Sequence, residues 1–237
     1  MSYKHILTGC DTDGMGFCKQ DMTPFSDEEC TEILDNLNSL FPELIFWEND
    51  GFFDISLIVR AKNYALIEHG SDKVIIKGSG LKATTKEPAL REMIKRMINS
   101  FLEVSEEKVE DIYTEYVKEA YKIKDMQRWC SKKSVTETML NGDDTSSRKK
   151  RAAIAGKGLE VGEKFFAYFT PDEDLKCLED FDGEYHVNKM LEKVFKTAVM
   201  FQTVLDMKEL CPNYKLKKNK QSLDKLVGNV ILRKKES

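Results

Sequence analysis

Two aspartates lie close together near the beginning of the sequence, in the stretch TGCDTDGMGF (residues 8–17). A single threonine separates Asp11 from Asp13, and glycines stand on both sides of the pair. Two carboxylates at this spacing in a turn can bind one hard divalent cation, and Mg²⁺ prefers carboxylate oxygen together with water and substrate phosphate. The stretch therefore indicates half of a metal-dependent phosphoryl-transfer site, which needs at least one further carboxylate from elsewhere.

The same aspartates also fit a second chemistry. A strand followed by Asp-x-Asp-Gly resembles the opening of the haloacid-dehalogenase-like phosphatases, in which the first aspartate is the nucleophile and the second the general acid. The GDD stretch at Gly142–Asp144 is similar to the distal metal-binding acids of that superfamily. That fold needs a parallel sheet with crossover helices, whereas residues 44–77 predict strand after strand. An acidic surface turn without chemistry is a third interpretation.

A hairpin and a helix are the elements that must position the acidic turn. KHILTG (residues 4–9) and GFCKQ (residues 16–20) predict two short strands, because Gly14 can take the positive φ that a tight reversal requires. Ser26 and Glu29 then form a capping box ahead of a helix with one apolar stripe. We expect this helix to pack across the sheet.

The character of the chain changes from strands to helices near residues 83–88. Before this point three β-rich segments predict three strands: LIFWEND (44–50), FFDISLIVRAKNYALIE (52–68) and KVIIKG (73–78). After Pro88 most segments have helical spacing, and a continuous apolar stripe predicts a long final helix over about residues 186–210. Only EKFFAYF (163–169) has the pattern of a strand there. We therefore expect an α+β fold with a boundary between residues 85 and 86.

The composition is that of an ordinary globular protein, with 41% hydrophobic and 33% charged residues over 237 positions. No apolar run reaches the roughly 18 residues needed to cross a bilayer, and the first residues form neither a basic leader nor an apolar signal core. We expect a cytoplasmic location and no membrane partner. The six cysteines are widely spread without a Cys-x-x-Cys pair, which favours reduced thiols over a zinc site.

The charge is unevenly distributed along the chain. The net charge of -4 argues against a protein that coats nucleic acid over its whole surface. Residues 146–158 and 214–222 are strongly basic, however, whereas residues 103–119 and 172–184 are rich in acids. Local basic strips on an acidic body suit a protein that binds a polyanion along one face, although a solvated lysine face produces the same pattern.

In order and spacing these motifs resemble the C-terminal third of the family B DNA polymerases, especially the T-even-phage-like members. GCDTDG (9–14) stands where that family has its Y-G-D-T-D-S palm motif. RAKNYAL (60–66) stands where it has K-K-R-Y-A, and KGSGL (77–81) where a lysine precedes a Gly-Leu pair. Residues 88–102 resemble the helix that leads into the thumb, and residues 148–169 the thumb segment that ends in a G-E/D-K-V-x-Y strand.

The resemblance implies catalytic roles for the acids. Asp13 is the principal metal ligand with Asp11 beside it, and the cofactor is Mg²⁺ in a two-metal site that a partner chain completes. Glu48 and Asp50 align loosely with an auxiliary acidic cluster, and solvated turn acids are the alternative for them.

The resemblance also implies DNA-binding roles. Lys62 and Lys77 would reach the minor-groove edge of the primer end, and Tyr64 would brace the primer strand, unless it is a plain core tyrosine. A further basic set fits a thumb surface that holds duplex phosphates without sequence preference, or else a solvated face. This set consists of Arg148, Lys149, Lys150, Arg151 and Lys157.

The chain also departs from the family pattern. Gly9, Cys10 and Gly14 replace the Tyr, Gly and Ser of the palm motif, and Ala61 and Asn63 replace two cationic positions. In the family the exonuclease domain, the other palm aspartate and the fingers helix with its nucleotide-binding lysine precede this motif, where this chain has no room for them. The start MSYKHIL resembles a natural beginning, which favours a split polymerase over a random fragment.

The sequence therefore predicts the C-terminal subunit of a split family B DNA-directed DNA polymerase, viral in origin. Residues 1–85 would form part of an antiparallel palm sheet with a packed helix, and residues 86–237 a mainly helical thumb with a basic tail. The expected partners are an N-terminal DNA polymerase subunit, primer–template DNA and dNTP, in the cytoplasm of a host. This chain alone should be inactive.

Two further interpretations remain open. One is a degenerate polymerase remnant that only binds DNA or a replisome partner, which the altered turn and the lost lysines motivate. The other concerns the tail KQSLDKLVGNV (220–230), which is similar to the ends by which such polymerases bind a sliding clamp. Leu226 and Val227 stand at two positions that are usually aromatic there, so an ordinary basic terminus is the alternative.

Overall fold

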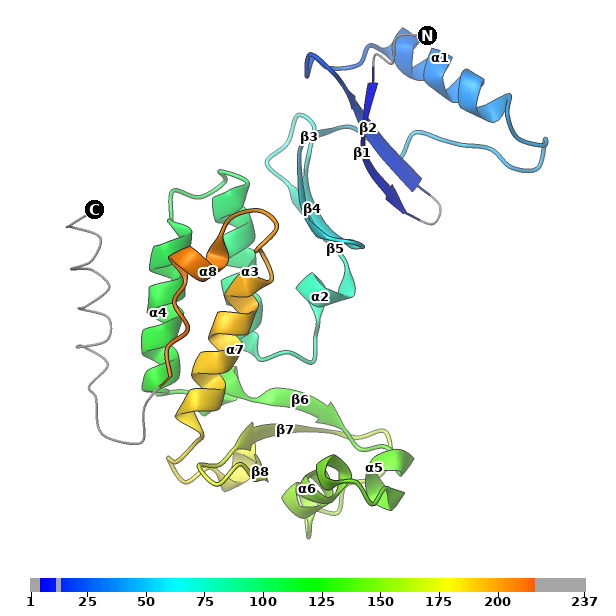
Figure 1. Cartoon of the computed structure of the whole chain (residues 1–237). Helices are drawn as coiled ribbons and strands as arrows, with labels where there is room; N and C mark the ends of the chain where they lie inside the picture. Colours follow the sequence, from blue (N-terminus) through cyan, green and yellow to red (C-terminus); the bar gives the residue numbers. More distant parts are fainter. Residues whose placement is uncertain (1–4, 12–13, 216–237) are drawn as a thin grey trace, which may run out of the picture. The chain divides into compact units, whose positions relative to one another are not determined.

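The computed structural model of the chain describes residues 5–11 and 14–215 and divides into two compact units (Figure 1). The first unit contains residues 1–54 and 68–70, and the second contains residues 55–67 and 71–237. The predicted boundary between residues 85 and 86, which would separate a palm from a thumb, does not coincide with this division and stays a prediction. The clamp-like tail lies outside the described residues.

The first unit begins with the predicted hairpin. Strands β1 (His5–Asp11) and β2 (Gly14–Lys19) pair antiparallel. Helix α1 (Asp27–Asn38) follows, and its capping box is confirmed, because Ser26 Oγ accepts from Glu29 N and the Glu29 carboxylate accepts from Ser26 N at 2.8 Å. An ion pair of 2.6 Å between Lys19 and Glu29 joins β2 to α1.

The predicted strand over residues 44–50 is wrong. This segment has no regular structure, and its backbone bonds to the end of α1 instead of to a sheet: Trp47 N donates to Asn38 Oδ1 at 2.5 Å, and Asn38 Nδ2 donates to Trp47 O at 3.1 Å. None of residues 5–10 and 14–54 is buried, helix α1 included, so the first unit has no core of its own among its described residues.

A three-stranded sheet in the order β3-β4-β5 comes next. It is formed by β3 (Phe53–Arg60), β4 (Asn63–Glu68) and β5 (Val74–Lys77), followed by the short helix α2 (Ser79–Lys82). The sequence predicted one strand over residues 52–68, whereas the structure has two. The chain reverses at Lys62, which takes a left-handed φ of 59°.

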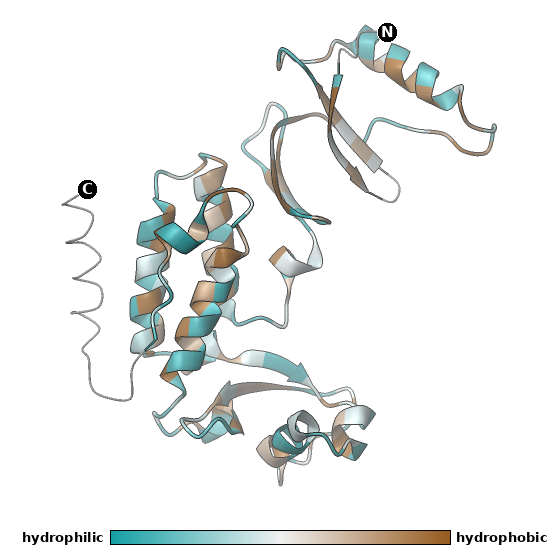
Figure 2. Ribbon diagram, viewed as in Figure 1, coloured by the Kyte–Doolittle hydropathy of each residue, from teal (hydrophilic) through white to brown (hydrophobic). Residues whose placement is uncertain are grey.

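The helices of the second unit pack around its larger core. The predicted helices after Pro88 are confirmed as α3 (Pro88–Phe101) and α4 (Val109–Tyr121), and α7 (Val187–Val199) packs against both (Figure 1). Each carries hydrophobic and hydrophilic residues together, as amphipathic helices on a core do (Figure 2). None of the helices within residues 5–11 and 14–215 is long and apolar enough to span a membrane.

The predicted final helix is too long. It ends at Val199, and a separate short helix α8 (Met207–Leu210) begins after Asp206, whose side chain accepts from Glu209 N. In the connection, the Thr203 hydroxyl donates to the carbonyl of Val59 in β3 at 2.5 Å. The segment after α7 is therefore not helical at the point where Thr203 binds the β3-β4-β5 sheet.

A second three-stranded sheet, in the order β6-β7-β8, has a smaller core of its own. The predicted strand is confirmed as β7 (Lys164–Phe169). The other elements of this region are η1 (Met126–Trp129), β6 (Ser131–Ser134), α5 (Glu137–Asn141), α6 (Thr145–Ile154), β8 (Leu175–Cys177) and η2 (Leu178–Asp180). The fold is α+β, as predicted. Every strand pair with a described register is antiparallel, unlike the parallel sheet of the phosphatase alternative.

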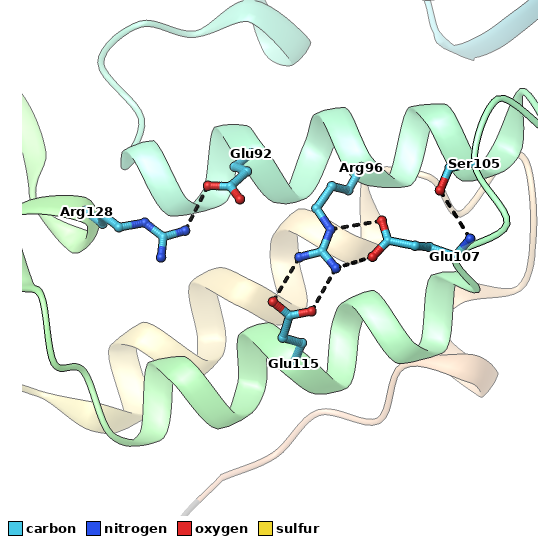
Figure 3. Close-up of polar contacts among 6 residues, drawn as sticks. All are labelled: Glu92, Arg96, Ser105, Glu107, Glu115 and Arg128. Atoms are coloured by element: carbon cyan, nitrogen blue, oxygen red, sulfur yellow. Dashed lines mark hydrogen bonds and ion pairs between the residues drawn. The ribbon is translucent and has the colours of Figure 1, made fainter.

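An arginine on α3 holds α4 and the connection before it (Figure 3). The Arg96 guanidinium donates to both carboxylate oxygens of Glu115 on α4, at 3.0 and 2.7 Å, and to both oxygens of Glu107. These hydrogen bonds raise the pKa of Arg96 and lower the pKa of Glu115. Bidentate pairing is the strongest form of this contact, because two parallel hydrogen bonds fix one geometry.

Replacing Arg96 by methionine should lower the free energy of unfolding of the second unit by about 1–2 kcal/mol, since both carboxylates are partly solvated. Arg91→Met is the matched control, because Arg91 is exposed on the same helix. Urea unfolding followed by circular dichroism measures both variants. The loss should shrink in 1 M NaCl, and equal stability of the two variants would contradict a role for the pairing.

None of the six cysteines, all of which lie within the described residues, forms a disulfide bond, as predicted. Cys10 is exposed, whereas Cys130, Cys177 and Cys211 are buried, and burial raises the pKa of the Cys130 thiol to about 12. Because the thiolate is the reactive form, we expect Cys10 to label rapidly with Ellman's reagent at pH 8 and the three buried thiols to label only on unfolding. Peptide mass spectrometry after timed labelling checks this, and early labelling of Cys130 would contradict the described core.

Candidate functional site

The acidic turn lies where the first hairpin closes. The last pair of the β1-β2 ladder joins Asp11 to Gly14, after the pair of Cys10 with Met15. The two strands that the sequence predicts on either side of this turn are therefore confirmed. Asp13, the predicted principal metal ligand, lies outside the described residues.

The donor chemistry of the turn suits a hard cation, since two carboxylates are the ligands that Mg²⁺ prefers in proteins. Within the described part of the chain, no three His, Cys, Asp or Glu side chains form a group that could hold a metal. Glu48 and Asp50 are exposed and lie in the irregular segment after α1 rather than at the end of a strand. Their role as auxiliary acids stays a prediction.

The predicted primer-strand residues meet at neighbouring strands of the β3-β4-β5 sheet. Tyr64 in β4 is directly opposite Lys77 in β5, and Lys62 lies at the turn before β4. Tyr64 is half-buried, whereas the two lysines are exposed. Two motifs that are separated in sequence thus come together, with their cations on the solvent side.

Asn63 holds these two motifs together, a role that sequence reasoning missed. Its Oδ1 accepts from Gly80 N at 2.8 Å and its Nδ2 donates to the carbonyl of Ala61 at 3.0 Å, with the residue only 6% exposed. Gly78 makes the close approach possible, because an added Cβ there would lie 2.1 Å from the Lys62 carbonyl oxygen. Asn63, which stands where the resemblance leads one to expect a cationic residue, therefore has a structural role.

The basic run of residues 148–151 is divided between structural contacts and solvent. Arg151 donates to the carbonyls of Met139, Leu140 and Gly142, which satisfies the carboxyl end of α5. Arg148 Nε donates to the carbonyl of Asp143 at 2.7 Å. Arg151 is therefore held by α5 and by Gly142 after it, and Arg148 donates through one nitrogen to the loop that precedes α6.

Two of the predicted DNA-binding lysines have partners as well. Lys149 Nζ donates to the Glu173 carbonyl at 2.6 Å, and Lys157 pairs with Asp180 at 2.6 Å and Glu179 at 3.3 Å. The hydrogen bonds to these two carboxylates raise the pKa of Lys157. Only Lys150, of this predicted set, makes no side-chain hydrogen bond or ion pair with a described residue.

The fold of this chain is similar to part of a solved DNA polymerase structure. No protein-family model matches the chain, and no curated protein matches it. Among solved structures, the chain is similar to the family B DNA polymerase from the hyperthermophilic archaeon Pyrobaculum calidifontis, with a TM-score of 0.57 and 16% sequence identity. The match covers 86% of this chain and 27% of that polymerase, so the chain spans about a quarter of its length.

Proposed function

We propose that this chain is the C-terminal subunit of a split family B DNA-directed DNA polymerase, contributing part of the palm (residues 1–85) and the thumb (residues 86–237). The observation that carries the proposal is the hairpin β1-β2, which closes at Asp-Thr-Asp-Gly in a chain whose fold matches such a polymerase over 86% of its length. The reaction would be template-directed nucleotidyl transfer from a dNTP to a DNA primer.

Asp11 and Asp13 would hold Mg²⁺ in this proposal, because the sequence places two carboxylates one residue apart where the β1-β2 ladder ends at the pair of Asp11 with Gly14. Mg²⁺ supplies stabilisation of the negative charge that develops on the phosphoryl group during transfer. Lys62, Tyr64 and Lys77 would hold the primer end, and the remaining palm aspartate and the fingers lysine would come from the partner.

The surface of the first unit supports a protein partner. Six apolar side chains there are more than half exposed: Leu7, Met22, Leu40, Leu44, Ile45 and Phe46. Four of the six lie within residues 40–46, and apolar side chains that gather on a surface often mark an interaction site. Removal of apolar surface from water stabilises an assembly by about 25 cal/mol per Å². A partner polypeptide that contains the rest of the palm would bury these apolar side chains.

Primer extension on a primed template with Mg²⁺ tests the proposal. The chain is assayed alone, and together with a candidate partner polypeptide that carries exonuclease, fingers and the other palm aspartate. We expect synthesis only from the pair. Synthesis by the partner alone at the rate of the pair would overturn the split site, and DNA binding by a pair without synthesis would favour the remnant.

A further inference from the structure

We propose that the loop of residues 38–47 docks into an apolar groove with a basic rim on the partner polypeptide. The proposal rests on the function proposed above. It goes further by naming the docking element of this chain and the chemistry of the surface that receives it. The loop starts at the last residue of α1 in the first unit (Figure 1), and all of its residues are described.

The two ends of the loop are joined to each other. The reciprocal hydrogen bonds between Asn38 and Trp47 close it, and the ring centroids of Phe41 and Trp47 lie 5.9 Å apart. Inside the loop, Ile45 N donates to the Pro42 carbonyl at 2.9 Å. These contacts hold the loop in one conformation before it binds, which reduces the conformational entropy that docking removes.

The loop exposes large apolar side chains to water. Leu44 is 93% exposed, Leu40 76% and Phe46 72%. Side chains at this exposure contribute little to the folding of this chain, because they withdraw little apolar surface from water. Apolar and aromatic side chains commonly form the buried centre of a protein interface, where a polar rim surrounds them. The loop therefore offers the centre of such an interface.

The surroundings of the loop are acidic. Residues 20–54 contain ten acidic residues and no lysine, arginine or histidine. Among the described residues, only two of the ten contact a basic side chain, each at 2.6 Å: Glu29 with Lys19, and Asp54 with His69. Glu43 and Glu48, which flank the apolar run of the loop, are exposed. The loop therefore lies in a stretch whose negative charge is largely uncompensated.

This combination of acidic and apolar surface favours one kind of partner. Nucleic acid and anionic lipid headgroups are negatively charged, so the acids would repel both. In a symmetric dimer the same acids of two copies would face each other, which is also repulsive. A protein groove that is apolar at its centre and carries lysine or arginine at its rim matches both features of the loop.

Binding of the candidate partner polypeptide to the full chain tests the docking, without DNA or dNTP, by biolayer interferometry. Leu44→Ser and Phe46→Ser should each raise the dissociation constant about 30-fold, because each removes a side chain that the groove would bury. Met22→Ser is the matched control, since Met22 is 72% exposed in the same unit but lies outside the loop. It should bind as the parent does. Circular dichroism checks that all three variants keep the parental fold.

The salt dependence of association tests the basic rim. The association rate of the parent chain should fall about 10-fold between 50 and 500 mM NaCl, because salt screens the attraction between the acids and the rim. Glu48→Gln should lower the association rate at 50 mM about 2-fold and leave the dissociation rate nearly unchanged. An association rate that does not depend on salt would overturn the proposed chemistry of the partner surface.

Hydrogen exchange gives a readout that needs no variant. The amides of Leu44 and Phe46 make no hydrogen bond within the described part of the chain, so they should exchange rapidly in the chain alone and slowly in the pair. Slow exchange in the chain alone at every concentration would mean that this chain covers the loop itself. Slow exchange only at high concentration would mean that a second copy covers it. Either result would overturn the proposal, as would parental affinity of both serine variants.

Primer extension by the same pair reports separately on the proposed polymerase. A pair that binds through the loop but synthesises no DNA would support the docking and contradict the polymerase. A pair that synthesises DNA while both serine variants bind as the parent does would contradict the docking alone. Absence of any binding between the parent chain and the candidate partner would overturn both.

Discussion

Replacing Asp13 by alanine is expected to lower the rate of primer extension by the assembled pair about 1,000-fold, with duplex binding unchanged. The loss corresponds to about 4 kcal/mol of transition-state stabilisation, because the variant lacks a carboxylate that, in the proposed site, would hold Mg²⁺ at the reacting phosphate. Single-turnover extension at saturating dNTP measures the rate, and anisotropy with the same primer–template measures binding.

Asp35→Ala is the matched control for this experiment. Asp35 is an exposed aspartate on α1 of the same unit, and the change removes one negative charge without touching the turn. It should extend primers at the parental rate. Equal activity of the Asp13 variant and the parent would make the acidic turn structural, and the remnant interpretation would then replace the polymerase.

The second large effect is expected at Gly78. Its φ of 100° is a conformation that other residues rarely adopt, and an added Cβ would also lie 2.6 Å from Asn63 Oδ1. Gly78→Ala should therefore destabilise the second unit by about 3 kcal/mol, since backbone strain adds to the displacement of Lys62 and Asn63. Urea unfolding monitored by tryptophan fluorescence measures the loss.

Gly156→Ala separates strain from overlap. Gly156 also has a positive φ, 73°, but no atom lies within 4 Å of an added Cβ. Gly156→Ala should lower the free energy of unfolding by only about 1 kcal/mol, because only the left-handed backbone conformation is unfavourable for alanine there. Equal effects of the two substitutions would show that the approach between Lys62 and Gly78 is looser than described.

Elements with strong local patterns could be predicted from the sequence. The β1-β2 hairpin has glycine at its turn, α1 has a complete capping box, and α3 starts at a proline, so each carries its own boundary signal. The strand β6 has none, because its sequence SKKS is polar and short. It forms through pairing with β7, which is a long-range contact that a local pattern does not contain.

For the candidate site, too, some features could be predicted from the sequence and others could not. The spacing of Asp11 and Asp13 is visible in the sequence, and so is the charge of residues 148–151. The partners of those charges are not visible, since Arg151 binds carbonyls of α5 and of Gly142 after it, and Lys157 binds η2 through Asp180.

The absence of buried residues among 5–10 and 14–54 has a consequence for how the protein is made. These residues leave the ribosome before those that form the larger core, at about 5–20 residues per second. Apolar side chains such as Leu44 and Phe46 therefore stay in contact with water during these several seconds, as they do in the folded chain. Capture of the nascent chain during translation would protect these side chains from aggregation, and synthesis without a binding partner should favour inclusion bodies.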